Sequence, residues 1–516
     1  MVWTDLANAM FMAVYTLALL MVSLYGFHRY ILVFLYYRHR DKEPRPQGTF
    51  KDLPHVTVQL PMYNEQFVAR RIIEKTCEID YPRDRLQIQV LDDSTDCTGA
   101  IARQTVEEAK AQGFDIEYIH RDHRRGFKAG AMENGLKTAR GEFIAIFDAD
   151  FVPEKYFLRR SIQYFTDPKV GAVQTRWEHL NRYDSLLTRS QAILLDGHFA
   201  IEHVARNRSN RFMSFNGTAG TWRRSAIDSS GGWQHDTLTE DLDLSYRAQL
   251  RGWKFVFLRE LAAPAELPPE MNAFKAQQFR WTKGGAQTAL KLLPKLLMSR
   301  EKLKVKVEGF LHLTCFTMHM YMALMITLML PAMYLRCLPV ENPLWRVSID
   351  VGAFALATLS AGVFYCAGQR ELLGGWRGTV KYLPMMMALG VGLCLSNTKA
   401  LLEAFLNRKS EFVRTPKYGI CQNNKKEAAS ALQTRRPKMD WLPYLEMIYG
   451  VYMLTCAIMS AVDLRSVILT PFLAIFTFGF FYVSVSSLLA QRVRQPARPE
   501  AVTVAASDSG PAEPLA

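Results

Sequence analysis

The sequence predicts an α/β domain with a mostly parallel sheet, joined to an α-helical bundle that spans a membrane. Two observations carry this prediction. Short β-rich runs alternate with helical stretches between residues 55 and 283, and apolar runs of membrane-spanning length flank this polar block. Alternation of strands and helices is typical of a parallel sheet covered by helices on both faces. Apolar runs of about twenty residues are typical of transmembrane helices.

The amino-terminal element is the mostly apolar run from Leu6 to Tyr25, which is long enough to cross a bilayer. A cleaved signal peptide fits poorly, because Asp5 precedes the run and the segment 30–37 prolongs its apolar character. Basic residues between positions 38 and 42 then place the next domain in the cytoplasm. We therefore expect residues 1–40 to form an N-terminal transmembrane helix.

The polar block at residues 50–285 is expected to form the cytosolic α/β domain. Its buried parallel strands are predicted at Val56–Leu60, Ile88–Leu91, Ile116–Ile119, Phe143–Phe147 and Val170–Gln174. The helices between them are predicted at Arg70–Glu78, Thr98–Gln112 and Ala129–Thr138.

The carboxy-terminal part alternates apolar runs with basic loops. Further crossings are predicted at Leu311–Leu335, Ile349–Ala367, Leu442–Val462 and Val467–Leu489. Leu383–Ser396 is shorter, and the loop that follows, at 408–438, holds nine Lys or Arg residues. Keeping that loop in the cytoplasm makes this segment interfacial or re-entrant, which gives five crossings with the amino terminus outside.

The remaining segments complete the expected organisation. Residues 286–310 are predicted as an interfacial helix and linker, because Gln287–Leu297 has an apolar stripe beside lysines; a soluble amphipathic helix is the alternative. Residues 311–490 form the transmembrane bundle, with the re-entrant or interfacial segment and a cytosolic loop at about 383–440. The tail 491–516 is rich in Ala, Pro, Ser and Glu and is predicted to be disordered.

Charge and cysteine usage narrow the function classes. The chain has 516 residues and a formal net charge of +14. Its Lys and Arg residues cluster beside apolar runs, as expected at an anionic cytoplasmic leaflet. No nucleic-acid-binding signature accompanies this charge, so no nucleic-acid partner is expected. The eight cysteines lack CxxC or metal-ligand spacing, which favours free thiols in a reducing compartment.

Acidic side chains follow two of the predicted strands. Asp92 and Asp93 end the second strand, and Asp148 and Asp150 begin where the run 143–147 ends. The carboxyl ends of parallel strands meet at one rim of a sheet, where ligands bind. Asp92 and Asp93 can accept hydrogen bonds from a base or ribose, and Asp148 and Asp150 can hold Mg²⁺ or Mn²⁺ on a diphosphate. The alternatives are a helix cap for the first pair and an ordinary turn for the second.

Three further groups follow along the chain. Lys128 stands at the start of a predicted helix and is followed by small residues. This position suits a diphosphate, although surface charge explains the lysine as well. Glu240 and Asp241 begin another helix, where Asp241 can act as the general base for an acceptor hydroxyl. Acids in a first helical turn are also ordinary stabilisers.

An aromatic motif comes last. Gln277, Arg280 and Trp281 offer a guanidinium group for phosphate and an indole face for a sugar ring. A buried tryptophan that packs the end of the domain is the alternative. Together the motifs, in this order, predict a transferase that uses a nucleotide sugar.

These residues resemble family 2 inverting glycosyltransferases of the GT-A fold, in the processive membrane branch that includes cellulose and hyaluronan synthases. Within that branch the chain is most similar to plant cellulose synthase-like A and C proteins and their bacterial relatives, from about residue 50 to 420. The segments that carry the resemblance are QLPMYNE (59–65), IQVLDDSTD (88–96), FKAGAM (127–132), FIAIFDADF (143–151), FNGTAGTWR (215–223), TLTEDLDLSYRAQLRGWKF (237–255) and QQFRWTKGG (277–285).

The resemblance implies roles for individual residues. It implies a Rossmann-like GT-A domain in which Asp92 and Asp93 bind the nucleoside and Lys128 lies near the diphosphate. It further implies that Asp148 and Asp150 hold the metal and that Asp241, beside Glu240, is the base. The sites for diphosphate and acceptor are Gln277, Arg280 and Trp281. Thr415 and Lys417 lie in a looser version of the family's gating loop, at 412–417.

The expected activity is processive synthesis of a linear β-glucan or β-mannan from UDP-glucose or GDP-mannose. The product would be carried across the inner (cytoplasmic) membrane through a channel. Aromatic residues such as Tyr321, Trp345 and Tyr452 could line it, although interfacial anchoring explains them equally well. The partners would be the growing polysaccharide, the lipid bilayer and, as a further candidate, a periplasmic protein. The alternatives are a lipid glucosyltransferase that makes a glycolipid, and a transporter or scaffold with a degenerate enzyme domain.

Overall fold

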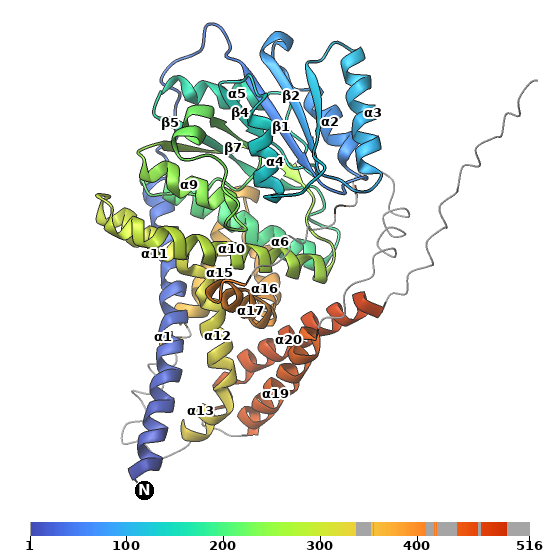
Figure 1. The fold of residues 1–516 in the computed structure, drawn as a ribbon. Coiled ribbons are helices and arrows are strands. Elements are labelled where there is room, and N and C mark those ends of the chain that lie inside the picture. Colours follow the sequence, from blue (N-terminus) through green and yellow to red (C-terminus); the bar gives the residue numbers. More distant parts are fainter. Residues whose placement is uncertain are drawn as a thin grey trace, which may run out of the picture.

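The computed structural model describes residues 2–336, 352–353, 355–408, 417, 419, 441–462 and 466–492. Thr415, most of the loop 409–440, Trp345 and the tail 493–516 lie outside the described residues. Figure 1 shows an α/β domain above a set of apolar helices, with the long helix α1 (Val2–His39) running down from the domain to the amino terminus.

A seven-stranded sheet in the order β3-β2-β1-β4-β6-β5-β7 forms the centre of the α/β domain. Its strands are β1 (Val56–Met62), β2 (Leu86–Asp92), β3 (Ile116–His120), β4 (Phe143–Ile146), β5 (Val170–His179), β6 (Gly220–Arg223) and β7 (Lys254–Ala265). The first four strands are mutually parallel, β6 is antiparallel to both β4 and β5, and β7 is parallel to β5. The predicted mostly parallel sheet is therefore confirmed.

Five strands match the predicted ones to within a few residues, whereas β6 and β7 have no counterpart among the predictions. β6 is only four residues long, and β7 includes Arg259, Glu260 and Pro264. The apolar run 255–258 at the start of β7 was an available signal, whereas β6 is too short to show one. The two added strands lie on the far side of β4 from β1 and extend the sheet in that direction.

Helices cover both faces of the sheet. They are α2 (Ala69–Cys77), α3 (Thr98–Ala111), α4 (Phe127–Leu136), α5 (Phe157–Ile162), α6 (Leu186–Gly197), the π-helical η3 (His198–Glu202), α7 (His203–Arg208), α8 (Arg224–Ser229) and α9 (Glu240–Leu250), with short 3₁₀ turns at Arg83–Arg85 and Gln163–Thr166. One core cluster packs α2, α3 and α5 on the sheet, and the other packs α4, α7, α8 and α9. The three predicted helices correspond to α2, α3 and α4.

The end of α1 belongs to the second of these cores. Leu32 and Tyr36 are buried against it, and the Tyr36 hydroxyl donates to Glu371 at 2.6 Å. This mostly apolar helix thus joins the membrane segment to the α/β domain directly. This packing makes α1 part of the domain's fold as well as an anchor.

Helix α10 (Met271–Met298) crosses beneath the α/β domain in Figure 1. It contains both the 277–281 motif and the segment Gln287–Leu297, so the expected boundary at 285/286 falls inside a continuous helix. Two glycines let neighbours approach it closely. A Cβ on Gly284 would lie 2.6 Å from Thr239, and a Cβ on Gly285 would lie 2.1 Å from Phe316. The start of α9 is therefore held against α10.

The remaining helices form the apolar part. They are α11 (Leu303–Thr314), η4 (Cys315–Thr317), α12 (Met318–Thr327), α13 (Met329–Arg336), η5 (Ala355–Leu359), α15 (Ser360–Leu373), η6 (Arg377–Tyr382), α16 (Leu383–Gly392), α17 (Cys394–Phe405), α19 (Leu442–Val462), η7 (Val467–Leu469) and α20 (Thr470–Arg492). By length and composition, five segments among the described residues are able to cross a membrane: Leu6–His39, Leu303–Thr327, Arg377–Phe405, Leu442–Val462 and Val467–Ala490.

Four of these segments overlap predicted crossings, and the fifth does not. Arg377–Phe405 includes the stretch for which an interfacial or re-entrant position is expected, and 67% of its apolar window is buried within the protein, against 33% for Leu442–Val462. The helix is also interrupted at Leu393, between α16 and α17. The predicted crossing at Ile349–Ala367 lies partly outside the described residues. The topology stays a prediction.

Candidate active site

A cavity of about 200 Å³ opens at the carboxyl ends of β1 and β4, beside the start of α9 and above α10. Loops that follow parallel strands converge at this rim, so polar residues distant in sequence meet there. The predicted residues that line it are Asp93, Lys128, Asp148, Asp150, Glu240, Asp241, Gln277, Arg280, Trp281 and Lys417. The motifs of the sequence are thus brought to a single site.

The two aspartates after β4 each pair with a lysine. Lys128 Nζ lies 2.5 Å from Asp148 Oδ1, and Lys417 Nζ lies 2.5 Å from Asp150 Oδ2. The two carboxylates attract these ammonium groups and would attract a divalent cation in the same way. Carboxylate oxygens are the ligands that Mg²⁺ and Mn²⁺ prefer. Among the described residues no group of three or more His, Cys, Asp or Glu side chains forms a metal cluster. Two carboxylates still fit a divalent ion that completes its shell with phosphate and water.

Asp241 lies in the first turn of α9 and borders the cavity. Its Oδ1 accepts a hydrogen bond from the Leu242 N–H at 2.8 Å, which orients the carboxylate. Burial and the neighbouring Glu240 carboxylate raise the pKa of Asp241 to about 7. A carboxylate with such a pKa is a good proton acceptor near neutral pH. The geometry therefore suits the predicted base.

The helix that carries Asp241 begins at the predicted place, but no side chain caps its first turn. Thr239 is the N-cap residue of α9, yet its side chain does not bond the helix backbone. The Thr239 hydroxyl lies 3.2 Å from the Thr288 hydroxyl of α10 instead. The start of α9 is thus fixed by a tertiary contact, which a local capping pattern does not contain.

A loop that sequence reasoning did not single out joins these groups. The Gly217 carbonyl accepts from Lys128 Nζ at 2.9 Å, and the Asp148 N–H donates to Thr218 Oγ1 at 2.8 Å. Gly217 has a φ of +80°, and a Cβ there would lie 2.9 Å from Asp241 Oδ2. Asn216 and Gly217 both line the cavity. The segment FNGTAG was part of the resemblance, and its glycine was the available signal.

Asp92 and Asp93 are separated by the structure. Asp92, the last residue of β2, is fully buried, accepts from the Tyr118 hydroxyl at 2.7 Å and does not line the cavity. Asp93 lines the cavity and forms an ion pair with Arg121. Successive side chains at a strand end point to opposite faces, which explains the difference. Of the two aspartates, Asp93 is therefore the one that borders the cavity.

Other cavity residues were not predicted. The Arg124 guanidinium lies 3.4 Å from the centre of the Tyr63 ring, and both residues line the cavity. Glu266 also lines it and accepts from Arg71 at 2.8 Å. Tyr63 stands in the segment QLPMYNE, but no pattern distinguished it from an ordinary turn residue.

Comparisons with known proteins agree with this site. Residues 54–284 match the family model described as "Glycosyltransferase like family 2". The chain is 35% identical over 418 residues to the probable glucomannan 4-β-mannosyltransferase 3 of Oryza sativa subsp. japonica, which covers 78% of this chain and 73% of that protein. It is 34% identical over 456 residues to glucomannan 4-β-mannosyltransferase 7 of Arabidopsis thaliana, covering 85% and 79%.

Two further matches differ in extent. The probable glucomannan 4-β-mannosyltransferase 7 of Oryza sativa subsp. japonica is 44% identical over 255 residues, and this match spans 44% of that relative's length. A solved mannosyltransferase of Pyrobaculum calidifontis, in complex with GDP-Man and Mn²⁺, has a TM-score of 0.52 at 18% identity and covers 77% of this chain and 100% of that one. At that identity the likeness concerns the fold alone.

The matches confirm the predicted GT-A type of catalytic domain. They extend well beyond the catalytic domain into the apolar helices, because the match to the Arabidopsis protein takes in 85% of the chain. The chain therefore belongs to the glucomannan 4-β-mannosyltransferase family of hexosyltransferases, with a catalytic domain of the family 2 glycosyltransferase type.

Proposed function

We propose that the chain is a membrane-embedded, inverting and processive β-glycosyltransferase. It polymerises a linear β-mannan or β-glucan from GDP-mannose or UDP-glucose at the cytosolic face of the cytoplasmic membrane. The observation that carries the proposal is the meeting of Asp241, the pair Asp148 and Asp150, and the 277–281 motif in a single cavity. The relatives' names, glucomannan 4-β-mannosyltransferases, favour GDP-mannose as the first donor to test.

The donor side of the cavity is suited to a nucleoside diphosphate. Asp93 and the Tyr63–Arg124 pair form the part that would hold the nucleoside. Asp148 and Asp150 would hold Mg²⁺ or Mn²⁺, which supplies positive charge to the diphosphate leaving group. Lys128, in the first turn of α4, brings a further positive charge next to Asp148. Burial alone would lower the pKa of Lys128, but Asp148, Glu240 and Asp241 outweigh it and raise the pKa.

The acceptor side provides the base and an aromatic face. Asp241 takes the proton from the acceptor hydroxyl as the oxygen attacks the anomeric carbon from the face opposite the diphosphate, which inverts the configuration. Trp281 and Arg280 lie on successive positions of α10 and border the same cavity. The indole face suits a sugar ring, and the guanidinium suits the phosphate oxygens. Glu240 adds negative charge beside Asp241 and keeps its pKa high.

A second cavity in the membrane part offers a route for the polymer beyond this site. This cavity, of about 600 Å³, is lined by Gln278 of α10, by Arg29 of α1 and by His319 and Asn397. Gln278 is adjacent to the active-site residue Gln277, so the two cavities share the helix α10. Tyr321 and Tyr452, which the sequence offered as channel residues, do not border this cavity. A polar chain needs such an enclosed route, because lipid leaves its hydroxyl groups without hydrogen bonds.

The lipid-glycosylating alternative keeps a specific observation in its favour. The wall of the second cavity is largely apolar, with methionines at positions 318, 322, 325 and 329 along consecutive helices. An apolar wall of this kind also suits the acyl chain of a lipid acceptor. The two functions share the chemistry at Asp241 and differ in the product.

Nucleotide release and product analysis test the proposal. Purified membranes would be offered GDP-mannose, UDP-glucose, UDP-GlcNAc and UDP-galactose in turn, with Mg²⁺ or Mn²⁺, and Asp241→Asn membranes would be the control. We expect nucleotide release with a single donor and an ethanol-insoluble polymer. A product that organic solvent extracts would instead show that the chain is a lipid glycosyltransferase and not a polymer synthase. If protein that binds nucleotide releases none from any donor, both the polymer synthase and the lipid glucosyltransferase are refuted. The scaffold with a degenerate enzyme domain would then be the remaining function.

A further inference from the structure

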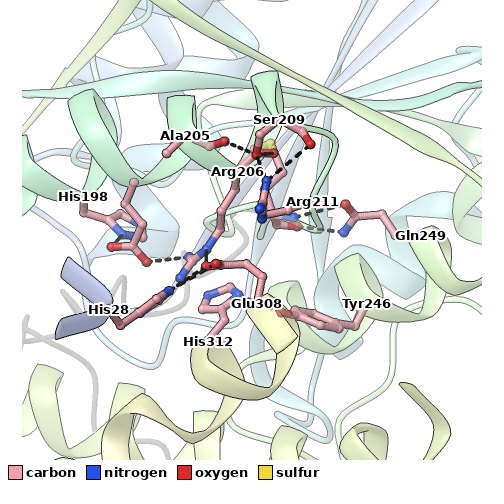
Figure 2. Close-up of polar contacts among 12 residues, drawn as sticks. His28, His198, Ala205, Arg206, Ser209, Arg211, Tyr246, Gln249, Glu308 and His312 are labelled. Atoms are coloured by element: carbon pink, nitrogen blue, oxygen red, sulfur yellow. Dashed lines mark hydrogen bonds and ion pairs between the residues drawn. The ribbon is translucent and has the colours of Figure 1, made fainter. Parts of the chain in front are cut away.

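Buried ionic groups from three separate elements meet where α1 joins the catalytic domain (Figure 2). His28 Nε2 of α1 lies 3.0 Å from Glu308 Oε1 of α11, and Arg206 Nε of α7 donates to the same oxygen at 2.9 Å. All three residues are less than 10% exposed. Charges are seldom buried unless they are paired, so this cluster binds α1, α7 and α11 to one another.

The cluster continues toward the active site through η3. Arg206 Nη1 lies 2.5 Å from Glu202 Oε1, and Glu202 Oε2 lies 3.1 Å from His198 Nδ1. His198 Nε2 in turn lies 3.0 Å from Asn216 Nδ2, and Asn216 borders the active-site cavity. An unbroken series of polar contacts therefore runs from the membrane helix α1 to the loop that follows β5 and α7. Its members are His28, Glu308, Arg206, Glu202, His198 and Asn216.

The local backbone supports a functional interpretation of this series. His198–Glu202 is a π-helical turn between α6 and α7. Such turns are rare and are found most often at functional sites. His198, Glu202 and Arg206 are spaced four residues apart, so their side chains lie on one side of the helix. The π turn thus stands where the helix must present His198 to the active-site loop.

The two contacts of the His198 ring define its tautomer. Nε2 lies 3.0 Å from the Asn216 amide nitrogen, which can only donate, so this contact fits the tautomer in which Nδ1 carries the proton toward Glu202. A carboxylate behind an imidazole fixes both its tautomer and its orientation. Glu202 is held in turn by Arg206. Each member of the series therefore orients the next one toward the loop.

The loop that Asn216 begins touches the catalytic groups. Gly217 O accepts from Lys128, Thr218 Oγ1 accepts from the Asp148 N–H, and the Gly217 Cα carbon faces the Asp241 carboxylate. The loop backbone has its own anchor, because the Asn216 N–H donates to Gln174 Oε1 at 2.8 Å. Loss of the His198 contact would therefore release the Asn216 side chain without unfolding the loop.

We propose that His198 is a positioning residue for the Asn216–Thr218 loop, and that the ionic series from His28 holds His198 in place. Turnover then depends on the docking of the membrane helix α1 onto the catalytic domain. This inference rests on the proposed glycosyltransferase function. It assigns to α1 a part in catalysis in addition to anchorage.

Two variants of His198 separate positioning from packing. His198→Asn places an amide nitrogen near Nδ1, so it keeps the contact with Glu202 and loses Asn216. His198→Gln reaches the place of Nε2, where its oxygen can accept from Asn216. We expect His198→Asn to lower kcat about threefold to tenfold, the range for one net hydrogen bond. Donor KM and thermal midpoint should stay near wild type, and His198→Gln should recover most of kcat.

A double-mutant cycle tests the link to α1. His28→Ala and His198→Asn would be measured singly and together in the full-length protein in lipid nanodiscs, with nucleotide release and donor binding as readouts. If both act through one series, the kcat losses combine to clearly less than their product. Multiplicative losses would overturn the link to α1, and equal activity of His198→Asn and His198→Gln would overturn the positioning role. Failure of the proposed function would look different, since wild-type protein would then release no nucleotide.

Discussion

A methyl group at Gly217 tests whether Asp241 is the base that the cavity geometry indicates. Gly217→Ala would place a Cβ 2.9 Å from Asp241 Oδ2 and 3.5 Å from Lys128 Nζ. Ordinary carbon–oxygen contacts begin at about 3.4 Å or more, so the carboxylate must withdraw by roughly 0.5 Å. The contact atom is the end of a side chain, which can move at small cost in stability. The damage should therefore appear in catalysis.

The size of the effect follows from two separate costs. A misplacement of about 1 Å in a reacting group costs about 10²-fold in rate, so a shift of roughly half that distance should lower kcat by about tenfold or more. The φ of +80° at Gly217 adds a backbone cost of about 1–2 kcal/mol for any L residue. In a domain of this size such a cost lowers the thermal midpoint by roughly 2–8 °C.

Gly232→Ala is the matched control. Gly232 has a φ of +69°, and a Cβ there meets no atom within 4 Å. It should lower the thermal midpoint to a similar extent and leave kcat within about twofold, because it carries the same backbone cost without the contact. The assay is nucleotide release under saturating donor, with donor binding measured in parallel. Equal kcat values for the two alanine variants would refute the placement of Asp241.

The remaining predictions concern the same cavity. Because the pKa of Asp241 is raised to about 7 and the base acts when deprotonated, turnover should rise with pH through neutrality. Glu240→Gln should move this rise to lower pH, since Glu240 raises that pKa; an unshifted pH profile would contradict the coupling. Asp241→Asn should abolish transfer and leave donor binding nearly intact, whereas measurable turnover would remove it as the base. Asp148→Asn should raise the Mg²⁺ or Mn²⁺ concentration for half-maximal activity by at least about tenfold in a metal titration. An unchanged metal requirement would show that Asp148 is not a metal ligand.

The helix α10 contacts both the catalytic domain and the apolar helices. It carries Gln277 toward the active site and Gln278 toward the membrane cavity, and its glycines 284 and 285 receive α9 on one side and Phe316 on the other. Lys283 is fully buried and pairs with Glu403 of α17 at 2.8 Å. Through these contacts α10 joins the start of α9 to the apolar helices.

The parts of the site that the sequence predicted correctly depend on short-range patterns. Apolar runs mark the strands, and polar residues directly after them must lie at the rim of a parallel sheet, so Asp148 and Asp150 could be placed without a structure. The helix start at Glu240 was found for a similar reason, since acids and a threonine mark a first turn. These signals act within about ten residues of the chain.

The tertiary structure decided what depends on distant partners. Asp92 and Asp93 are adjacent in sequence, yet only Asp93 faces the cavity, because the side to which each points depends on how β2 packs. The strands β6 and β7 take their places by pairing with β5, whose residues lie far from them along the chain. The contacts between His28 and Glu308 and between His198 and Asn216 join residues that no local period relates. Buried ion pairs form only where several elements exclude water together, and that arrangement exists only in the folded chain.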